Sequence, residues 1–142
     1  MSFNWTNYFT LSIKLLGYKT LFNRQILPLL FKYNCFSNQC YEARLRTSIS
    51  RAYYAAFCSA RNFLRDKDKD PNIPKDASAH AYVRYKFMNS TDIDRKAIGT
   101  NLDRLRDDRN DADYDDMVPA IDKMAEYAIM TCEDIMAKLS II

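Results

Sequence analysis

The chain has 142 residues and a formal net charge of +3 at pH 7, and 48% of its residues are hydrophobic. This length predicts a single domain over residues 1–142 with one hydrophobic core, and so small a charge permits an anionic partner without requiring one. The longest apolar run, residues 26–31, is interrupted by Pro28 and is far too short to span a bilayer, so we expect no membrane partner.

The first part of the chain is expected to be helical, because it has few chain breakers and no strand-like alternation. Helices are expected over residues 4–22 and 25–33, followed by a polar turn over 34–39. The clearest helix covers residues 41–66, where apolar side chains recur at steps of four and three residues. This inward stripe is rich in alanine, so a neighbouring helix can approach closely. It consists of Leu45, Ile49, Ala52, Ala56, Ala60 and Phe63.

A charged segment with two prolines, residues 67–76, predicts a loop after this helix. A shorter helix is expected over residues 78–88. The segment from Asn89 to Asp92 then offers N-cap side chains for a further helix over residues 92–113.

The last helix is expected to be capped by Asp115 and Asp116, with Pro119 in its first turn. Together these elements predict an all-α fold, an antiparallel helical bundle of about four to six helices. The apolar stripe of the last helix consists of Met117, Ile121, Met124, Ala128, Cys132, Ile135 and Leu139.

The four cysteines do not resemble a disulfide framework. Cys58 and Cys132 fall within helical apolar patterns, where a thiol behaves as a small hydrophobe. Cys35 and Cys40 could form a bridge in an oxidising compartment, but no signal peptide precedes them. We therefore expect a reduced, cytoplasmic protein. Because the one histidine is far from the cysteines, we expect no zinc site. No other metal and no cofactor are expected.

The side of the 41–66 helix opposite the alanine-rich stripe is basic. One interpretation is a nucleic-acid surface, on which the arginines contact the phosphodiester backbone and Tyr54 stacks on or hydrogen-bonds to the ligand. A solvated helix face whose arginines pair with acidic residues explains the same pattern. This basic stripe consists of Arg44, Arg51, Tyr54, Cys58, Arg61 and Arg65.

A second unusual position is Arg109. Ile98, Leu102 and Leu105 form the inward stripe of the 92–113 helix, and the next position on that stripe is Arg109. Burying a guanidinium without a partner is costly. Arg109 therefore either meets carboxylates inside the fold or faces a cleft that a ligand or a second subunit completes.

Arginines and aspartates are interleaved around Arg109. Arg109 and Asp113 are four residues apart and can form an ion pair, and Arg106 shares the neighbouring row with Asn110. One interpretation is a polar network that sets the helix register. The other is a guanidinium held ready for a phosphate, whose oxygens match its planar fork. The aspartates point around the helix rather than converging, so they do not indicate a cation site.

Two segments of the chain resemble the HEPN domain (higher eukaryotes and prokaryotes nucleotide-binding), in its small stand-alone prokaryotic branch. They are SRAYYAAF, from Ser50 to Phe57, and RNDADYD, from Arg109 to Asp115, with His80 between them. The resemblance covers about residues 41–140. Residues 1–40 match less well and are interpreted as an atypical N-terminal helical extension.

The resemblance implies an all-α bundle that dimerises, with the arginine motif of each subunit facing a shared cleft. Many family members are metal-independent endoribonucleases that act as toxins or phage-defence effectors, often beside a small nucleotidyltransferase. In those ribonucleases a histidine follows the arginine by five residues, where this chain has Tyr114. A tyrosine with a pKa of about 10 is a poor general base at neutral pH, although His80 could supply an imidazole.

The leading hypothesis is a homodimer that binds RNA or a nucleotide at a cleft centred on Arg109, and that could cleave RNA. The alternative is a non-catalytic interaction module, or a regulatory partner of a nucleotidyltransferase that modifies Tyr53, Tyr54 or Tyr114. The candidate catalytic residues are Arg109, Asn110, Tyr114 and His80. The candidate RNA- or nucleotide-binding residues are Arg51, Tyr54, Arg106 and Asp113.

Overall fold

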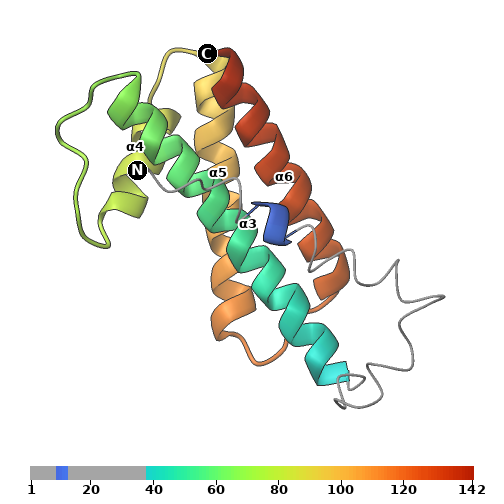
Figure 1. The fold of residues 1–142 in the computed structure, drawn as a ribbon. Helices are drawn as coiled ribbons and strands as arrows, with labels where there is room; N and C mark the ends of the chain where they lie inside the picture. Colours follow the sequence, from blue (N-terminus) through green and yellow to red (C-terminus); the bar gives the residue numbers. More distant parts are fainter. Residues whose placement is uncertain (1–8, 13–37) are drawn as a thin grey trace.

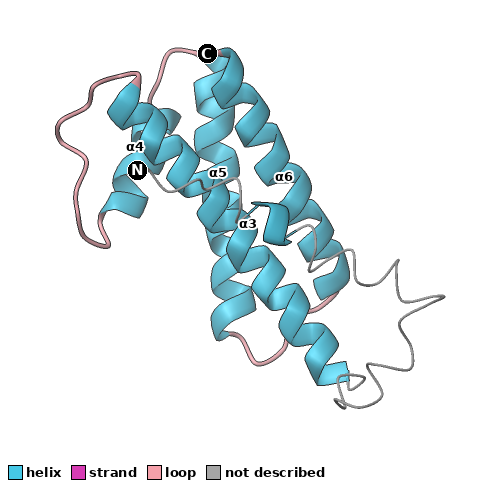
Figure 2. Ribbon diagram, viewed as in Figure 1, coloured by secondary structure: helices cyan, strands magenta, loops and turns pink. Residues whose placement is uncertain are grey.

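The structure is a computed structural model that describes residues 9–12 and 38–142. Throughout these ranges the regular elements are helices joined by loops (Figures 1 and 2). A short helical segment covers residues 9–12, and α3 (Asn38–Asp66), α4 (Ala79–Met88), α5 (Ile93–Tyr114) and α6 (Ile121–Ile141) follow. The all-α helical bundle expected from the sequence is confirmed.

The expectations for the N-terminal part of the chain fall mostly outside the described residues. Of the helix expected over residues 4–22, only residues 9–12 are described, and they are helical. The helix expected over residues 25–33 lies outside the described residues, and so does Cys35, whose pairing with Cys40 of α3 is therefore not tested. The helix expected from residue 41 begins three residues earlier, at Asn38.

The core of the bundle is built on the alanine-rich stripe of α3. Every residue of that stripe is buried, and through this face α3 packs on both α5 and α6. α5 runs antiparallel to both of these helices (Figure 1). α4 packs mainly on α5 and also contacts α3. None of the described helices has a stretch long and apolar enough to cross a membrane.

The junction between α4 and α5 follows directly from the sequence. Asp92 caps α5 as expected, because its carboxylate accepts a 2.9 Å hydrogen bond from the backbone N–H of Arg95. Gly99 then allows α5 to approach the end of α4. A Cβ atom added at Gly99 would lie 2.5 Å from the backbone nitrogen of Met88. The absence of a side chain at this position therefore sets the distance between the two helices.

The expected start of the last helix is wrong. Asp115 is the C-cap of α5, and α6 begins only at Ile121, after Ala120 in the left-handed conformation (φ 52°). Pro119 therefore precedes the helix, and Met117, expected on its apolar stripe, is 85% exposed.

The reason lies in Arg46 of α3, which holds the end of α5 and the segment after it. Its guanidinium donates hydrogen bonds of 2.8 Å to the carbonyl oxygen of Ala112 and 2.7 Å to that of Asp115. A 3.3 Å hydrogen bond to the carbonyl oxygen of Asp116 completes the set. These three carbonyl groups therefore have a hydrogen-bond partner in the Arg46 side chain. The chain continues as a loop after α5 instead of entering a new helix.

Candidate functional site

A pocket of about 230 Å³ opens where α3, α4 and α5 meet. All three helices contribute polar or aromatic side chains to it, and five of the eight candidate site residues from the sequence line it together. We call this the arginine pocket. It is lined by Tyr53, Tyr54, Ala77, His80, Ala81, Arg84, Arg106, Arg109 and Asn110.

Arg109 occupies the position expected from the helical stripe. Its neighbours on that stripe, Leu105 and Ala112, are buried, whereas the Arg109 side chain is 20% exposed and faces the pocket. The Arg109 Nε atom lies 2.7 Å from a carboxylate oxygen of Asp113, as the four-residue spacing predicted. Burial lowers the pKa of Arg109, but the Asp113 carboxylate and the hydroxyl groups of Tyr114 and Tyr54 together raise it by more, so the pKa is raised overall. The guanidinium therefore keeps its charge.

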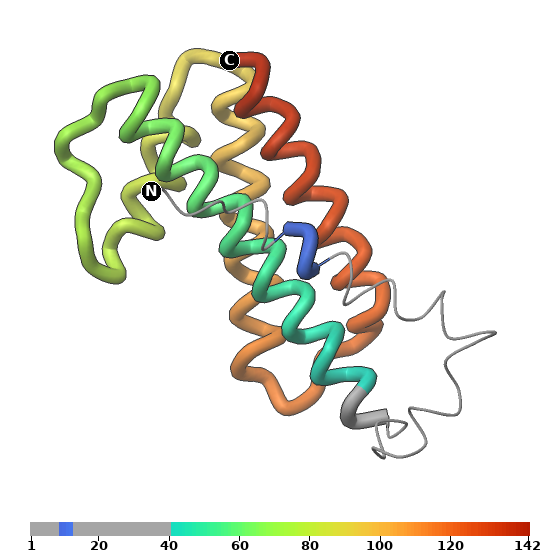
Figure 3. The backbone as a smooth tube through the Cα atoms, viewed as in Figure 1, coloured from blue at the N-terminus to red at the C-terminus, as the bar shows by residue number. Residues whose placement is uncertain are grey.

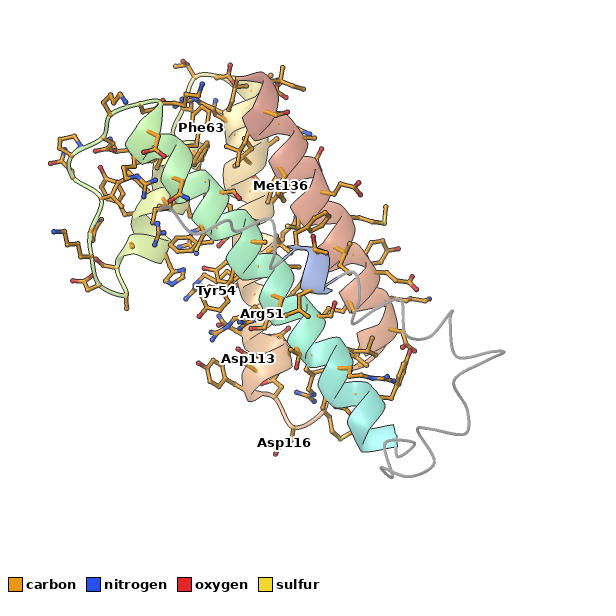
Figure 4. All side chains as sticks on the ribbon, in the orientation of Figure 1. Arg51, Tyr54, Phe63, Asp113, Asp116 and Met136 are labelled. Atoms are coloured by element: carbon orange, nitrogen blue, oxygen red, sulfur yellow. The ribbon has the colours of Figure 1, made fainter. Side chains whose placement is uncertain are left out.

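Two aromatic rings hold the Arg109 guanidinium from the sides. Its central carbon lies 5.8 Å from the ring centroid of Tyr54 and 5.3 Å from that of Tyr114, which are cation–π distances. Arg51 lies over Tyr54 at 5.2 Å. Figure 4 shows Arg51, Tyr54 and Asp113 along the same side of the bundle. The rings and the carboxylate together restrict the directions in which Arg109 can point.

The other two arginines of the pocket are also oriented by aspartates. Arg84 forms a 2.8 Å ion pair with Asp103, and Arg106 lies 3.5 Å from Asp107. None of these aspartates lines the pocket, and among the described residues its lining contains three guanidinium groups and no carboxylate. Each arginine is thus paired with an aspartate outside the pocket, while the pocket itself is lined by guanidinium groups without a carboxylate, which suits an anionic ligand.

His80 lines this pocket together with Arg109. No pattern in the sequence indicated that these two residues are neighbours. Its Nδ1 atom lies 2.6 Å from the Tyr53 hydroxyl, and its ring stacks on Phe57 at 4.0 Å between centroids. Burial lowers the pKa of His80, and the charges of Arg109, Arg106 and Arg61 lower it further. Burial also raises the pKa of Tyr53 to about 12. Both groups are therefore neutral at physiological pH.

The remaining predicted site residues lie beside the pocket instead of lining it. Arg51 and Asp113 contact its walls through Tyr54 and Arg109. Tyr114 is 71% exposed and reaches the pocket only through its contact with Arg109. One member of the basic stripe was misplaced, because the Cys58 side chain is buried in the core and its pKa is raised by burial to about 11.

Sequence reasoning missed Arg84, and it considered Tyr53 only as a modification site. Arg84 follows His80 by four residues, so both side chains project from the same face of α4. That spacing is the signal that could have found it. No comparable signal exists for the bond between Tyr53 and His80, which lie 27 residues apart on different helices.

No three His, Cys, Asp or Glu side chains are grouped to hold a metal ion in the described ranges, 9–12 and 38–142. This includes the aspartates around Arg109, of which Asp103, Asp107 and Asp113 pair with arginines.

Comparison with known proteins gives one match. A family model described as the HEPN domain matches residues 36–142, which begins just before α3 and includes α3, α4, α5 and α6. No curated protein and no solved structure matches the chain.

Proposed function

Because this chain belongs to the HEPN-domain family, we propose that it is an RNA-binding protein whose arginine pocket holds a phosphodiester group. The observation that carries the proposal is the convergence of Arg84, Arg106 and Arg109 on one small pocket without a carboxylate in its lining. A guanidinium offers paired donors that match two phosphate oxygens. A volume of about 230 Å³ suits a phosphate group with part of its ribose better than a whole nucleotide.

We propose further that the bound phosphodiester is cleaved by attack of its neighbouring 2′-hydroxyl, with His80 moving the proton. A neutral imidazole is the basic form of histidine, so His80 can accept the proton of the 2′-hydroxyl as the 2′-oxygen bonds to phosphorus. The bond to the 5′-oxygen then breaks, and the imidazolium returns the proton to that oxygen. Arg109 stabilises the negative charge that develops on the phosphoryl oxygens. The products are a 2′,3′-cyclic phosphate and a 5′-hydroxyl.

The test is cleavage of a labelled RNA in the presence of a metal chelator by the wild type and by Arg109→Ala. Arg104→Ala is the matched control, because Arg104 lies on the same helix but is exposed and does not line the pocket. We expect Arg109→Ala to abolish cleavage and to weaken RNA binding, while its circular dichroism stays helical and Arg104→Ala behaves as the wild type. Full activity in Arg109→Ala would remove Arg109 from the mechanism.

A second candidate function is a non-catalytic interaction module. It is favoured by Tyr114, which stands in place of the motif histidine, and by the ion pair that Arg109 already forms with Asp113. On this hypothesis the Arg109–Asp113 pair is a contact to a partner or to a second copy. It predicts no RNA cleavage under any condition and a complex that dissociates when Asp113 is changed to Lys.

Association of two copies is part of the proposal, with the arginine pockets facing a shared cleft. HEPN domains commonly dimerise, and the strongly exposed Tyr114 beside Arg109 is a suitable contact residue. Light scattering of the purified protein should give the mass of two chains. A mass of one chain at all concentrations would contradict this.

We propose a toxin–antitoxin or phage-defence setting, with a nucleotidyltransferase as the partner that the family resemblance favours. The Tyr114 hydroxyl is the most accessible acceptor for such an enzyme near the pocket, because Tyr53 is buried and Tyr54 is partly buried. Mass spectrometry after co-expression would detect a nucleotidyl group on Tyr114. Unmodified tyrosines would leave this partnership without support.

A further inference from the structure

A second cavity lies beside the arginine pocket, under the loop over residues 67–78 that connects α3 to α4. We propose that this cavity, the loop pocket, binds the base of a single-stranded RNA nucleotide whose phosphate occupies the arginine pocket. The inference rests on the proposed RNA binding and adds a site for the base. The loop pocket has a volume of about 580 Å³ and is lined by Phe57, Arg61, Arg65, Asp70, Pro71, Ile73, Pro74, Lys75, Asp76, Ala79 and His80.

The first support is the position of His80, which lines both pockets. Its ring is fixed by stacking on Phe57 and by the bond to Tyr53, so it forms a shared wall. A nucleotide base is joined to its phosphate through the ribose alone. Two pockets that share one side chain as a wall can therefore accept the two ends of one nucleotide, with the ribose passing His80.

The second support is the chemistry of the lining. Ile73 and Pro74 supply most of the apolar surface, since Phe57 is only 5% exposed, and the volume falls within the range of pockets that enclose small organic groups. The Arg61 guanidinium lies 5.8 Å from the ring centroid of Phe57 at the same wall. Aromatic rings and guanidinium planes are the surfaces on which unpaired RNA bases stack. The three basic side chains of the lining outnumber its two carboxylates, which suits a ligand that carries phosphates.

The third support is the way the loop is fastened. Figure 3 shows residues 67–78 bulging away from the helices before the chain enters α4. Both carboxylate oxygens of Asp68 accept hydrogen bonds from Arg95, at 2.8 and 2.6 Å. Asp70 accepts a 2.8 Å hydrogen bond from the Tyr82 hydroxyl and lies 3.2 Å from the Lys86 ammonium. These bonds tie the first part of the loop, including Asp70 of the cavity lining, to α4 and α5.

The occupant is single-stranded, because a base in a duplex is stacked and paired and cannot leave the helix to enter a side cavity without being unpaired. A base also presents flat apolar faces to Ile73 and Pro74, which a bare phosphate or a carboxylate lacks. A protein segment in the loop pocket is the competing occupant. The experiment below separates the two, since a protein segment predicts no dependence of RNA affinity on the bases.

The experiment compares two short oligomers of equal length that share a 2′-O-methyl ribose-phosphate backbone. One carries bases and the other is abasic, and neither has the hydroxyl needed for cleavage. Their affinities are measured by fluorescence anisotropy. We expect the wild type to bind the base-bearing oligomer about tenfold more tightly, which is the usual effect of one stacked base. Equal affinity for the two oligomers would overturn the inference, and this comparison needs no variant.

The variant Ile73→Trp fills the loop pocket, and Asn72→Trp is its matched control, because Asn72 is exposed in the same loop and does not line the pocket. We expect Ile73→Trp to lose the preference for bases and to keep the affinity for the abasic oligomer, while Asn72→Trp changes neither. Arg109→Ala should weaken binding of both oligomers. If Arg109→Ala weakens binding and Ile73→Trp keeps the base preference, the loop pocket is excluded. If Arg109→Ala changes nothing, the proposed function fails instead.

Discussion

The Tyr53 hydroxyl and the Nδ1 atom of His80 lie 2.6 Å apart, so a tyrosine of α3 fixes the imidazole of α4 at the edge of the arginine pocket. Because this bond uses Nδ1, proton exchange with a ligand falls to Nε2. A histidine held in this way has one ring orientation, and Nε2 can accept a proton in the tautomer whose Nδ1–H donates to the Tyr53 oxygen. On the proposed function, this pair supplies from other helices the imidazole that the arginine motif lacks at Tyr114.

The first prediction tests this pair with Tyr53→Phe. We expect the rate of RNA cleavage at saturating enzyme to fall at least about tenfold, because His80 loses its orientation. RNA affinity should stay nearly unchanged, since the arginines are untouched. The free energy of unfolding should fall by about 1 kcal/mol for the lost hydrogen bond. Single-turnover cleavage and chemical denaturation measure these effects. Tyr127→Phe is the control, because Tyr127 is 64% exposed. An unchanged rate would mean that Tyr53 does not position His80.

The second prediction concerns pH and stability. Burial and the nearby arginines lower the pKa of His80 below its ordinary 6.5. His80 has the ordinary pKa in the unfolded chain and the lowered pKa in the folded protein. At a pH between these values the unfolded chain binds more protons than the folded one, so the wild type loses stability as the pH falls below 6.5. Above pH 6.5 the His80 side chain is mainly neutral in both the folded and the unfolded chain, so this effect is absent.

The variant His80→Gln isolates that contribution. We expect the free energy of unfolding of the wild type, minus that of His80→Gln, to decrease as the pH is lowered from neutral to about 5. Urea denaturation at several pH values measures the difference, which removes the contribution of the carboxylates common to both proteins. A difference that does not change with pH would show that His80 titrates normally in the folded state.

Much of the fold was predictable because its signals are local. The α3 stripe from Leu45 to Phe63 follows helical periodicity, and Asp92 has the side chain that an N-cap requires. Arg109 was predictable for the same reason, since it interrupts a regular apolar stripe and has Asp113 one turn away. Each of these inferences needs only the spacing of residues within one helix.

The errors have a different physical origin, because they depend on contacts between distant segments. Asp115 and Asp116 have good capping side chains, but Arg46 of α3 uses their carbonyl groups and delays α6. The partnership of His80 with Arg109 exists only because α4 folds back on α3 and α5. Neither effect leaves a periodic pattern in the sequence.

The third prediction tests that role of Arg46 with Arg46→Met, which keeps much of the aliphatic stem. The variant loses hydrogen bonds to the carbonyl oxygens of Ala112, Asp115 and Asp116. We expect the free energy of unfolding to fall by about 1–3 kcal/mol, because these are bonds from a charged donor. Arg104→Met, on an exposed position of α5, should leave stability within about 0.5 kcal/mol. Equal stability of the two variants would contradict the role assigned to Arg46.

The last prediction concerns the close approach of α4 and α5 at Gly99. In an exposed helix interior, Gly→Ala stabilises by roughly 0.5–1 kcal/mol, because alanine restricts the unfolded chain and has the higher helix propensity. At Gly99 the sign should reverse. The new Cβ would lie 2.5 Å from the backbone nitrogen and 2.9 Å from the Cα atom of Met88, and backbone cannot rotate away as a side chain can. We expect Gly99→Ala to destabilise the protein by about 1–3 kcal/mol.

Thermal and urea denaturation of Gly99→Ala and of Thr100→Ala measure this effect. Thr100 is the next residue of α5 and is exposed, so its change to Ala alters helix propensity without a clash. We expect Thr100→Ala to be neutral or slightly stabilising. Because α4 carries His80 and Arg84, a shift of α4 away from α5 also separates these side chains from Arg109. Gly99→Ala should therefore weaken RNA binding even at temperatures where it is fully folded. A stable Gly99→Ala protein with normal RNA affinity would show that α4 and α5 need not approach so closely.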